Sequence, residues 1–166
     1  MTVTNLAVRP ATLADAEAIC TIYNQGIEDR IATLETELRT PEERRQWLAA
    51  RSPRHPVIVA CLDARVVGWG SLNVYKPREA YRHVADFSLY VDRGSRGQGV
   101  GRQLLEHLIE TARGLGYHKL MLSTFPFNAK GVALYESLGF ERVGICRQMG
   151  LLEGAWVDTL LMDKLL

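Results

Sequence analysis

Apolar residues occur along the chain both in short continuous runs and at helical spacing, and the two patterns predict different elements. The continuous runs are rich in Val, Leu and Ile and have the length of strands. A short turn at 63–65 separates two of them, which are therefore expected to pair as a hairpin. The predicted strands are 6–8, 57–62, 66–74, 84–91, 120–122, 139–147 and 155–163.

Four further segments repeat their apolar residues every three or four positions, which is typical of amphipathic helices. The best-defined helix start is at Thr40, which can cap the helix, followed by Pro41 in the first turn and Glu43 to complete a capping box. Gly116 and Gly139 are expected to end the last two helices. The predicted helices are about 13–27, 40–51, 98–115 and 128–138.

The order of these elements predicts an α/β fold in which helices pack on a central sheet. The chain has 166 residues, of which 47% are hydrophobic and 23% charged. This length and composition favour one globular domain, residues 1–166, and exclude a disordered, collagen-like or coiled-coil chain.

Charge and cysteine usage exclude several classes of function. Lys and Arg number 20 and Asp and Glu 19, so the basic excess typical of a nucleic-acid-binding protein is absent. No apolar run approaches the roughly 18 residues of a membrane span, and residues 1–14 lack the apolar core of a signal peptide. The cysteines are not spaced for a disulfide framework, and neither they nor the histidines are spaced for a metal site. We therefore expect a cytoplasmic protein without a metal, a nucleic-acid partner or a membrane.

The most specific motif is the glycine-rich turn 96–101, Arg-Gly-Gln-Gly-Val-Gly, between a predicted strand and a predicted helix. The first N–H groups of a helix lack partners inside the helix, and its dipole is positive there, so such a turn favours a phosphate group. A dinucleotide-binding fingerprint needs G-x-G-x-x-G and a later acid, and a P-loop needs G-K-[ST]; neither pattern is present. Two interpretations remain, a coenzyme A turn of the form R/Q-x-x-G-x-G/A and a turn that serves only chain geometry.

Several segments together resemble the GCN5-related N-acetyltransferase (GNAT) superfamily. Within it, the chain is similar to the branch that acetylates phosphinothricin, methionine sulfoximine and arsinothricin. The resemblance covers nearly the whole chain. It is carried by Ile22-Tyr23-Asn24 and by the segments 75–91, 96–101, 128–140 and 154–158.

The resemblance implies the GNAT fold, with a mixed sheet of six to seven strands, a splayed strand pair and about four helices. The splayed pair would be 84–91 and 119–123, and the pantetheine arm of acetyl-CoA would lie in the opening between them. The glycine-rich turn would hold the pyrophosphate, and Asn128 would bind the pantetheine arm. The implied coenzyme-binding residues are Leu89, Tyr90, Val91, Arg96, Gly97, Gln98, Gly99, Val100, Gly101, Arg102, Asn128 and Lys130.

Two side chains are candidates for the proton transfers of acetyl transfer. Asp86 is the candidate base; the similar branch commonly has Glu here, and the shorter Asp side chain favours proton transfer through a water molecule. Tyr135 stands where the superfamily has a Tyr that donates to the coenzyme sulfur, although the similar branch often has His. The alternatives are that Asp86 only binds an ammonium group and that Tyr135 only packs its helix on the sheet.

The loop 75–82 is cationic and aromatic, and it directly precedes the strand that carries Asp86. Arg can bind a carboxylate through two hydrogen bonds, which suits an acidic amino-acid substrate. The resemblance implies acetylation of the α-amine of such a small amino-acid analogue, hence detoxification or resistance, by a homodimer. The alternatives are a peptide or protein N-acetyltransferase and a non-catalytic acyl-CoA-binding module. The candidate substrate-binding residues are Lys76, Arg78, Tyr81, Arg82, Glu28 and Thr33.

Overall fold

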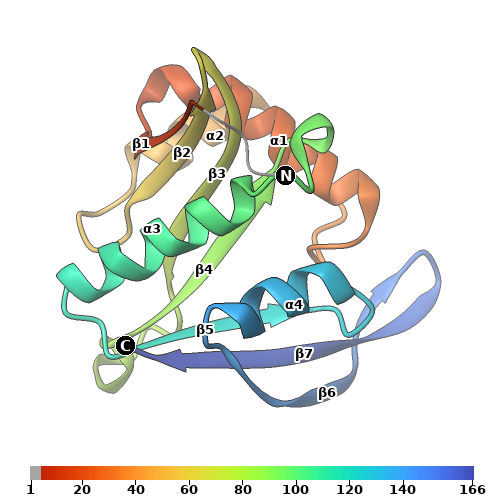
Figure 1. Ribbon diagram of the computed structural model, residues 1–166. Coiled ribbons are helices and arrows are strands. Elements are labelled where there is room, and N and C mark those ends of the chain that lie inside the picture. Colours follow the sequence, from red (N-terminus) through yellow and green to blue (C-terminus); the bar gives the residue numbers. More distant parts are fainter. Residues whose placement is uncertain (1–4) are drawn as a thin grey trace.

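The computed structural model describes residues 5–166, which form one sheet flanked by helices (Figure 1). The strands of this part of the chain are β1 (Leu6–Pro10), β2 (Val57–Leu62), β3 (Arg65–Val74), β4 (Val84–Val91), β5 (Lys119–Thr124), β6 (Glu141–Leu152) and β7 (Ala155–Leu165). Its helices are α1 (Ala16–Asp29), α2 (Pro41–Ala49), α3 (Val100–Gly114) and α4 (Ala129–Ser137), with short 3₁₀ turns at Leu13–Asp15, Glu79–Tyr81 and Arg93–Ser95. The predicted α/β fold with a mixed sheet is confirmed.

The strands of this sheet follow the order β1-β2-β3-β4-β5-β7-β6. Neighbouring strands are antiparallel except β4 and β5, which are parallel. The β4–β5 pairing stops at Asp86↔Met121, whereas β4 stays paired with β3 as far as Val91. The two parallel strands therefore separate after Asp86 (Figure 1), and the predicted splayed pair is confirmed.

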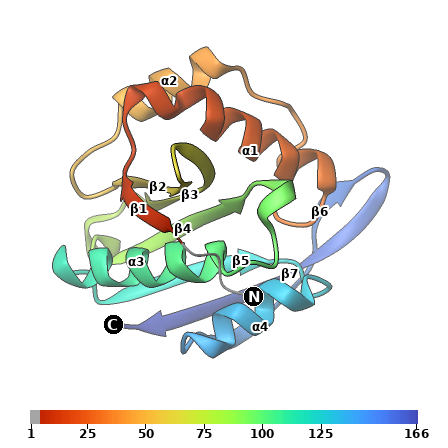
Figure 2. The same cartoon turned by 45° about the horizontal axis from the view of Figure 1, so that its top comes forward.

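Helices cover both faces of the sheet, α1 and α2 on one face and α3 and α4 on the other (Figure 2). On the first face, Ile19 and Ile22 of α1 pack on Val59 and Trp69. On the second face, the apolar side of α3 packs on β1, β2, β3 and β4. Because side chains alternate along a strand, β4 presents successive residues to opposite layers. This alternation places the functional side chains of β4.

Most helix and strand ends differ from the predictions by one to three residues or more, and three of these differences have a clear structural cause. The first helix begins at Ala16 rather than 13, since residues 13–15 form a 3₁₀ turn. The third helix begins at Val100 rather than 98, because Gly99 precedes it with a φ of 87°. The strand predicted at 139–147 runs from Glu141 to Leu152, past a β-bulge where Gln148 has a φ of 50°. The polar residues Arg147 and Gln148 at the bulge interrupt the apolar alternation that predicts a strand.

Among residues 5–166, no helix is long and apolar enough to cross a membrane, and no three His, Cys, Asp or Glu side chains converge as metal ligands. The three cysteines are free thiols; Cys20 and Cys61 are buried and Cys146 is partly buried.

Candidate active site

Two cavities meet where β4 and β5 separate. The glycine groove, of about 520 Å³, runs along the glycine-rich turn and the start of α3. The Asp86 pocket, of about 280 Å³, lies deeper, between β4, β5 and the loop after α1. The two cavities share the side chains of Ala32, Leu89, Tyr90, Asn128 and Tyr135. A ligand in the glycine groove can therefore reach the Asp86 pocket through the opening in the sheet.

The glycine groove is formed because the glycines of the turn have no side chains that would fill the space beside the backbone. Gly97 and Gly99 have φ values of 75° and 87°, a backbone region that favours glycine. A Cβ atom at Gly97 would meet no other atom within 4 Å, and one at Gly101 would make only ordinary contacts. The positive end of the α3 dipole points into this space. These features fit a pyrophosphate group.

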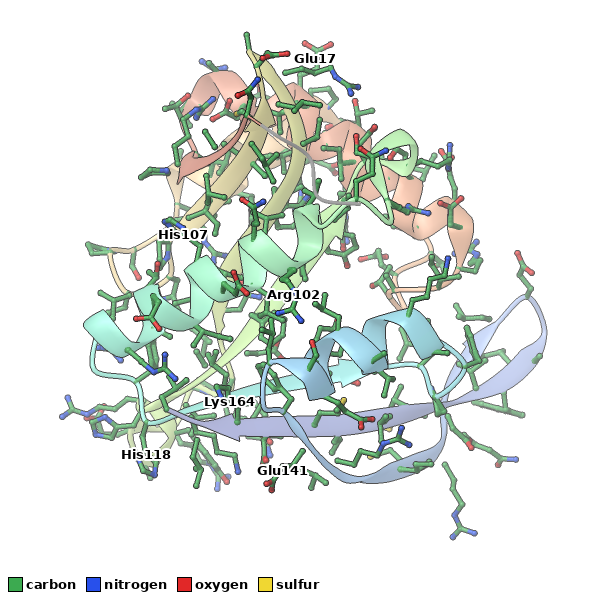
Figure 3. The ribbon with its side chains drawn as sticks, in the orientation of Figure 1. Glu17, Arg102, His107, His118, Glu141 and Lys164 are labelled. Atoms are coloured by element: carbon green, nitrogen blue, oxygen red, sulfur yellow. The ribbon has the colours of Figure 1, made fainter. Side chains whose placement is uncertain are left out.

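Two basic side chains line the same groove. Lys130 of α4 is exposed. Arg102 lies between α3 and α4, where it donates to Ser137 Oγ over 2.8 Å (Figure 3). Lys130 adds to the positive potential at the helix N-terminus, as an anionic ligand requires. Arg102 adds less, because its Nη1 lies 3.3 Å from Glu106 Oε1.

Arg96 also lines the groove, but its guanidinium is already paired. Its Nη1 lies 2.7 Å from Asp29 Oδ2, and Arg93 approaches the same carboxylate to 2.8 Å. These two cations hold the pKa of Asp29 below its usual value. Arg96 thus attaches the glycine-rich turn to the end of α1. Gln98, by contrast, does not line the groove, and its Nε2 donates to the Gly94 carbonyl over 3.5 Å.

Asn128 and Tyr135 lie along α4 and line both cavities. Asn128 caps the helix, since its Oδ1 accepts from the Gly131 N–H over 3.2 Å while its Nδ2 donates to Thr124 Oγ1 over 3.2 Å. One Nδ2 hydrogen remains for a ligand. The Tyr135 ring packs against Phe87, and burial raises the pKa of Tyr135 to about 12. Tyr135 therefore stays protonated at neutral pH and can donate a proton.

Asp86 reaches the opening from the other side of the sheet. Tyr90 stacks on Trp69 with ring centroids 5.0 Å apart, which places the side chain of Tyr90 on the α1/α2 face. Asp86 shares that face by strand alternation, whereas Phe87 and Tyr135 lie on the α3/α4 face. Burial raises the pKa of Asp86 to about 6. The pocket thus holds a carboxylate of raised basicity on one face and a neutral phenol on the other.

The loop after α1 forms the outer wall of the Asp86 pocket through Thr33 and Leu34. Asn24 holds the far end of this loop, because its side chain accepts from the Arg39 N–H and donates to the Arg39 carbonyl, both over 2.9 Å. Leu34 packs against Gly150 of β6 so closely that a Cβ atom there would overlap it. The loop is therefore fixed at both sides of the pocket.

Four residues with hydroxyl groups on the pocket wall, Ser88, Ser123, Thr124 and Thr159, were not among the predicted site residues. Ser88 lies two positions after Asp86, and its neighbour Asn73 donates to it over 3.0 Å. Thr124 and Thr159 line the pocket from β5 and β7 and are nearly fully buried. Only the alternation along β4 could have indicated Ser88, and no local pattern indicates Thr159, because the β5–β7 pairing brings it to the site.

The loop 75–82 lies away from the Asp86 pocket. Lys76, Arg78, Tyr81 and Arg82 line a separate cavity of about 320 Å³ and not the Asp86 pocket. There Lys76 Nζ stands 5.4 Å from the ring centre of Tyr81. Their role in substrate binding stays a prediction.

The two candidates after the first helix lie in different places. Thr33 lines the Asp86 pocket. Glu28 is exposed, and its carboxylate lies 3.2 Å from Arg93 Nη2. The structure thus brings Thr33, but not Glu28, to the same cavity as Asp86.

Comparison with known proteins agrees with this geometry. The model of the acetyltransferase (GNAT) family matches residues 19–140, so the chain belongs to that family. The L-methionine sulfoximine/L-methionine sulfone acetyltransferase of Pseudomonas paraeruginosa is 34% identical over 95% of this chain and 92% of its own.

Two solved structures have the same fold. The phosphinothricin acetyltransferase of Sinorhizobium meliloti in complex with acetyl-CoA has a TM-score of 0.90 and 28% identity, over 98% of this chain and 89% of its own. The ribosomal-protein-alanine N-acetyltransferase of Brucella melitensis has a TM-score of 0.93 and 40% identity, over 96% of this chain and 99% of its own.

The protein is therefore an acyltransferase of the GNAT family, an N-acetyltransferase with acetyl-CoA as donor. Within the family it falls in the phosphinothricin-type branch.

Proposed function

We propose that the protein acetylates the α-amine of a small amino-acid analogue of the phosphinothricin, methionine sulfoximine or arsinothricin type. The observation that carries this proposal is the Asp86 pocket, whose roughly 280 Å³ suits an amino acid and whose outer wall is the fixed loop after α1. The names of relatives support the same substrate class. Acetylation removes the charge of the α-ammonium group, so such a reaction would detoxify an analogue that mimics an amino acid.

Acetyl-CoA supplies the acetyl group as a thioester, and the glycine groove has the shape and charge to hold it. The N–H groups at the start of α3 face the space for the pyrophosphate, and Arg102 and Lys130 add positive charge. The unpaired edge of β4 after Asp86 offers main-chain groups at Leu89 and Val91 to the pantetheine arm. The thioester would then lie at the opening, between Asp86 and Tyr135.

The acceptor amine enters as an ammonium ion and must lose a proton before it can attack, because an ammonium ion has no lone pair. Asp86 takes this proton, directly or through one water, and releases it to solvent. The nitrogen then bonds to the acetyl carbon, the carbon–sulfur bond breaks, and the nitrogen loses a second proton. Tyr135 gives its proton to the departing sulfur. The second proton from nitrogen passes to solvent and Tyr135 regains a proton from solvent, so the products are an amide, a thiol and one released proton.

Replacing Tyr135 with Phe is expected to lower kcat by about 100-fold or more, because a general acid typically contributes about 10²–10⁴ in rate. Phe keeps the ring that packs against Phe87 and Phe140, so the melting temperature should change little. Steady-state kinetics and thermal unfolding measure the two quantities. An unchanged kcat would show that Tyr135 only packs α4 on the sheet.

A thiol-release assay over a panel of amines tests the substrate class. The panel contains phosphinothricin, L-methionine sulfoximine, arsinothricin, L-glutamate and a short peptide that begins with alanine. We expect kcat/KM to be at least about tenfold higher for one of the analogues than for the peptide. Turnover of the peptide alone would contradict the proposal.

The second candidate is a peptide or protein N-terminus as acceptor. The 40% identity to the ribosomal-protein-alanine N-acetyltransferase of Brucella melitensis favours it. The small volume of the Asp86 pocket, about 280 Å³, counts against it, and Thr33 and Leu34 line that pocket. The same panel separates the two candidates.

We infer that the protein forms a homodimer through β6, the edge strand of the sheet. Several large apolar side chains of β6 and β7 are exposed to solvent, as at a protein–protein interface. Among them, Leu151 stands opposite Trp156 in the β6–β7 register. The exposed apolar side chains of these two strands include Val143, Ile145, Met149, Leu151 and Trp156, of which Trp156 is 62% exposed.

Replacing Trp156 with Glu is expected to convert a dimer into a monomer, because it places a charge within an apolar contact. Light scattering coupled to size-exclusion chromatography measures the mass. Glu141→Gln changes a charge at the other end of β6 and serves as the control that keeps the dimer. A wild-type mass of one chain would contradict the inference.

A further inference from the structure

Neighbouring positions of β3 and β4 carry a row of polar side chains on the α1/α2 face of the sheet. Ser71 stands opposite Ser88 and Asn73 opposite Asp86 in the antiparallel register. Ser71 is fully buried, whereas Ser88 and Asp86 line the Asp86 pocket. The row therefore runs from the protein interior to the site of proton transfer.

The hydrogen bonds of this row fix the orientation of the Asn73 amide. Its Oδ1 accepts from Ser71 Oγ over 2.9 Å and from Arg51 Nη2 over 3.0 Å. An Arg nitrogen is only a donor, so the atom it meets must be the oxygen of the amide. The Asn73 Nδ2 consequently donates to Ser88 Oγ, 3.0 Å away.

Arg51 is itself held from several sides. Its Nε donates to the His55 carbonyl over 2.9 Å, its Nη2 also donates to the Leu72 carbonyl, and its guanidinium lies 4.6 Å from the ring centre of Trp47. No carboxylate pairs with Arg51 in the part of the chain that the structure describes. The guanidinium thus serves as a donor to Asn73 and the main chain.

The fixed amide determines what Ser88 offers to the pocket. A hydroxyl group has one donor hydrogen and two acceptor lone pairs, and Asn73 occupies one lone pair. One lone pair and the hydrogen remain. Ser88 and Asp86 are two positions apart on one strand face, about 6.6 Å along the strand. Two hydrogen bonds of about 2.8 Å that share one atom span only about 5.6 Å, so a nitrogen bound to Ser88 connects to Asp86 through one water molecule. Both side chains line the pocket in which that water would lie.

We propose that Ser88 binds the acceptor amine together with Asp86, and that Arg51 and Asn73 are positioning residues that aim the Ser88 hydroxyl. The free lone pair of Ser88 accepts one N–H of the amine, and its hydrogen is donated to the water that relays the proton to Asp86. This arrangement suits the short Asp86 side chain, since Ser88 holds the amine where Asp86 alone would not reach it. The inference rests on the proposed acetylation of an amine in this pocket.

Replacing Ser88 with Ala tests the inference. A hydrogen bond to a charged group contributes about 1.5–3 kcal/mol, so the KM for the amine should rise by about 10- to 100-fold. The KM for acetyl-CoA should stay within about twofold, because Ser88 does not line the glycine groove. Ser88→Thr keeps the hydroxyl and should restore the KM for the amine to within about threefold of wild type. An unchanged KM in Ser88→Ala would overturn the inference.

A double-mutant cycle separates positioning from mere stabilisation. Asn73→Ala should raise the KM for the amine in the wild type but have no further effect in Ser88→Ala, because Asn73 acts through Ser88. Equal effects in both backgrounds would contradict the positioning role. Thr111→Ala is the control, since Thr111 lies on α3 outside the Asp86 pocket and its hydroxyl donates to the His107 carbonyl. Its KM for the amine should equal that of the wild type.

The acceptor used in these assays is L-methionine sulfoximine. If the wild type acetylates only the alanine peptide, the proposed substrate class fails, and the same variants are compared with the peptide. A normal KM of Ser88→Ala for whichever amine the wild type acetylates removes Ser88 from the site. The two failures are therefore distinguishable.

Discussion

Replacing Asp86 with Asn is expected to lower kcat/KM for the amine by about 10²–10³-fold at pH 7, the range of a lost general base. Asn is close in size and keeps a polar group near Ser88, but it cannot accept the proton of an ammonium ion. The KM for acetyl-CoA should be unchanged, because Asp86 lies outside the glycine groove. Steady-state kinetics of thiol release with each substrate varied in turn provides the measurement.

The pH dependence of the loss in kcat/KM tests whether Asp86 acts as the general base that deprotonates the amine. Burial raises the pKa of Asp86 to about 6, so kcat/KM of the wild type should rise with pH to a midpoint near 6 and then level off. In Asp86→Asn this limb should disappear. The rate should instead rise steadily with pH as solvent deprotonates more of the amine, so the deficit shrinks above pH 8. A pH-independent deficit would indicate that Asp86 only binds the ammonium group.

The stability of Asp86→Asn against thermal unfolding should rise, whereas its activity falls. The pKa of Asp86 is higher in the folded chain, about 6, than the 3.8 of the free carboxyl group, so its ionised form destabilises the folded state. This cost is absent below pH 4 and complete above pH 6. Asp86→Asn should therefore be more stable than wild type by about 2–3 kcal/mol at pH 8 and equally stable at pH 4. Lower stability at pH 8 would mean that the kinetic loss reflects misfolding.

Local patterns were sufficient to predict most elements and one part of the site. The strands 57–62 and 84–91 were predicted with their observed ends, because continuous apolar runs depend only on neighbouring residues. The capping box at Thr40 is present, with Thr40 N–H donating to Glu43 over 2.7 Å. The glycine-rich turn forms the groove that its composition suggested.

The rest of the site depends on contacts between distant segments, which no local pattern records. Thr159 enters the pocket only because β7 pairs with β5. Ser88 gains its fixed hydroxyl from Arg51, 37 positions earlier along the chain, by way of Asn73. Arg96 was predicted to bind the coenzyme; it lines the glycine groove, and its guanidinium also pairs with Asp29 of α1. In each case the residue type was visible in the sequence and its partner was not.

Replacing Gly101 with Asp is expected to raise the KM for acetyl-CoA by about 100-fold or more without unfolding the protein. Gly101 is the second residue of α3 and lines the glycine groove. Its φ is not in the left-handed region, and a Cβ atom there would lie 3.6 Å from Leu134, an ordinary contact. The new carboxylate would stand where the pyrophosphate binds, and two like charges at such short range repel strongly.

The same carboxylate should leave the stability of the free protein equal or slightly higher. An acidic side chain in the first turn of a helix interacts favourably with the helix dipole, by about 0.3–1 kcal/mol. The melting temperature without ligand should therefore not fall, while the stabilisation that acetyl-CoA gives to the wild type should be lost. An unchanged melting temperature without ligand, together with a lost stabilisation by acetyl-CoA, shows a binding defect rather than a folding defect.

Gly101→Asn is the control, because Asn has nearly the same shape as Asp without its charge. We expect its KM for acetyl-CoA to rise far less than that of Gly101→Asp, and the ratio of the two values gives the electrostatic part of the effect. Added salt should reduce this ratio, since the groove is open to solvent. Equal KM values for the two variants would show that side-chain bulk, and not the anion-binding N-terminus of α3, governs coenzyme binding at this turn.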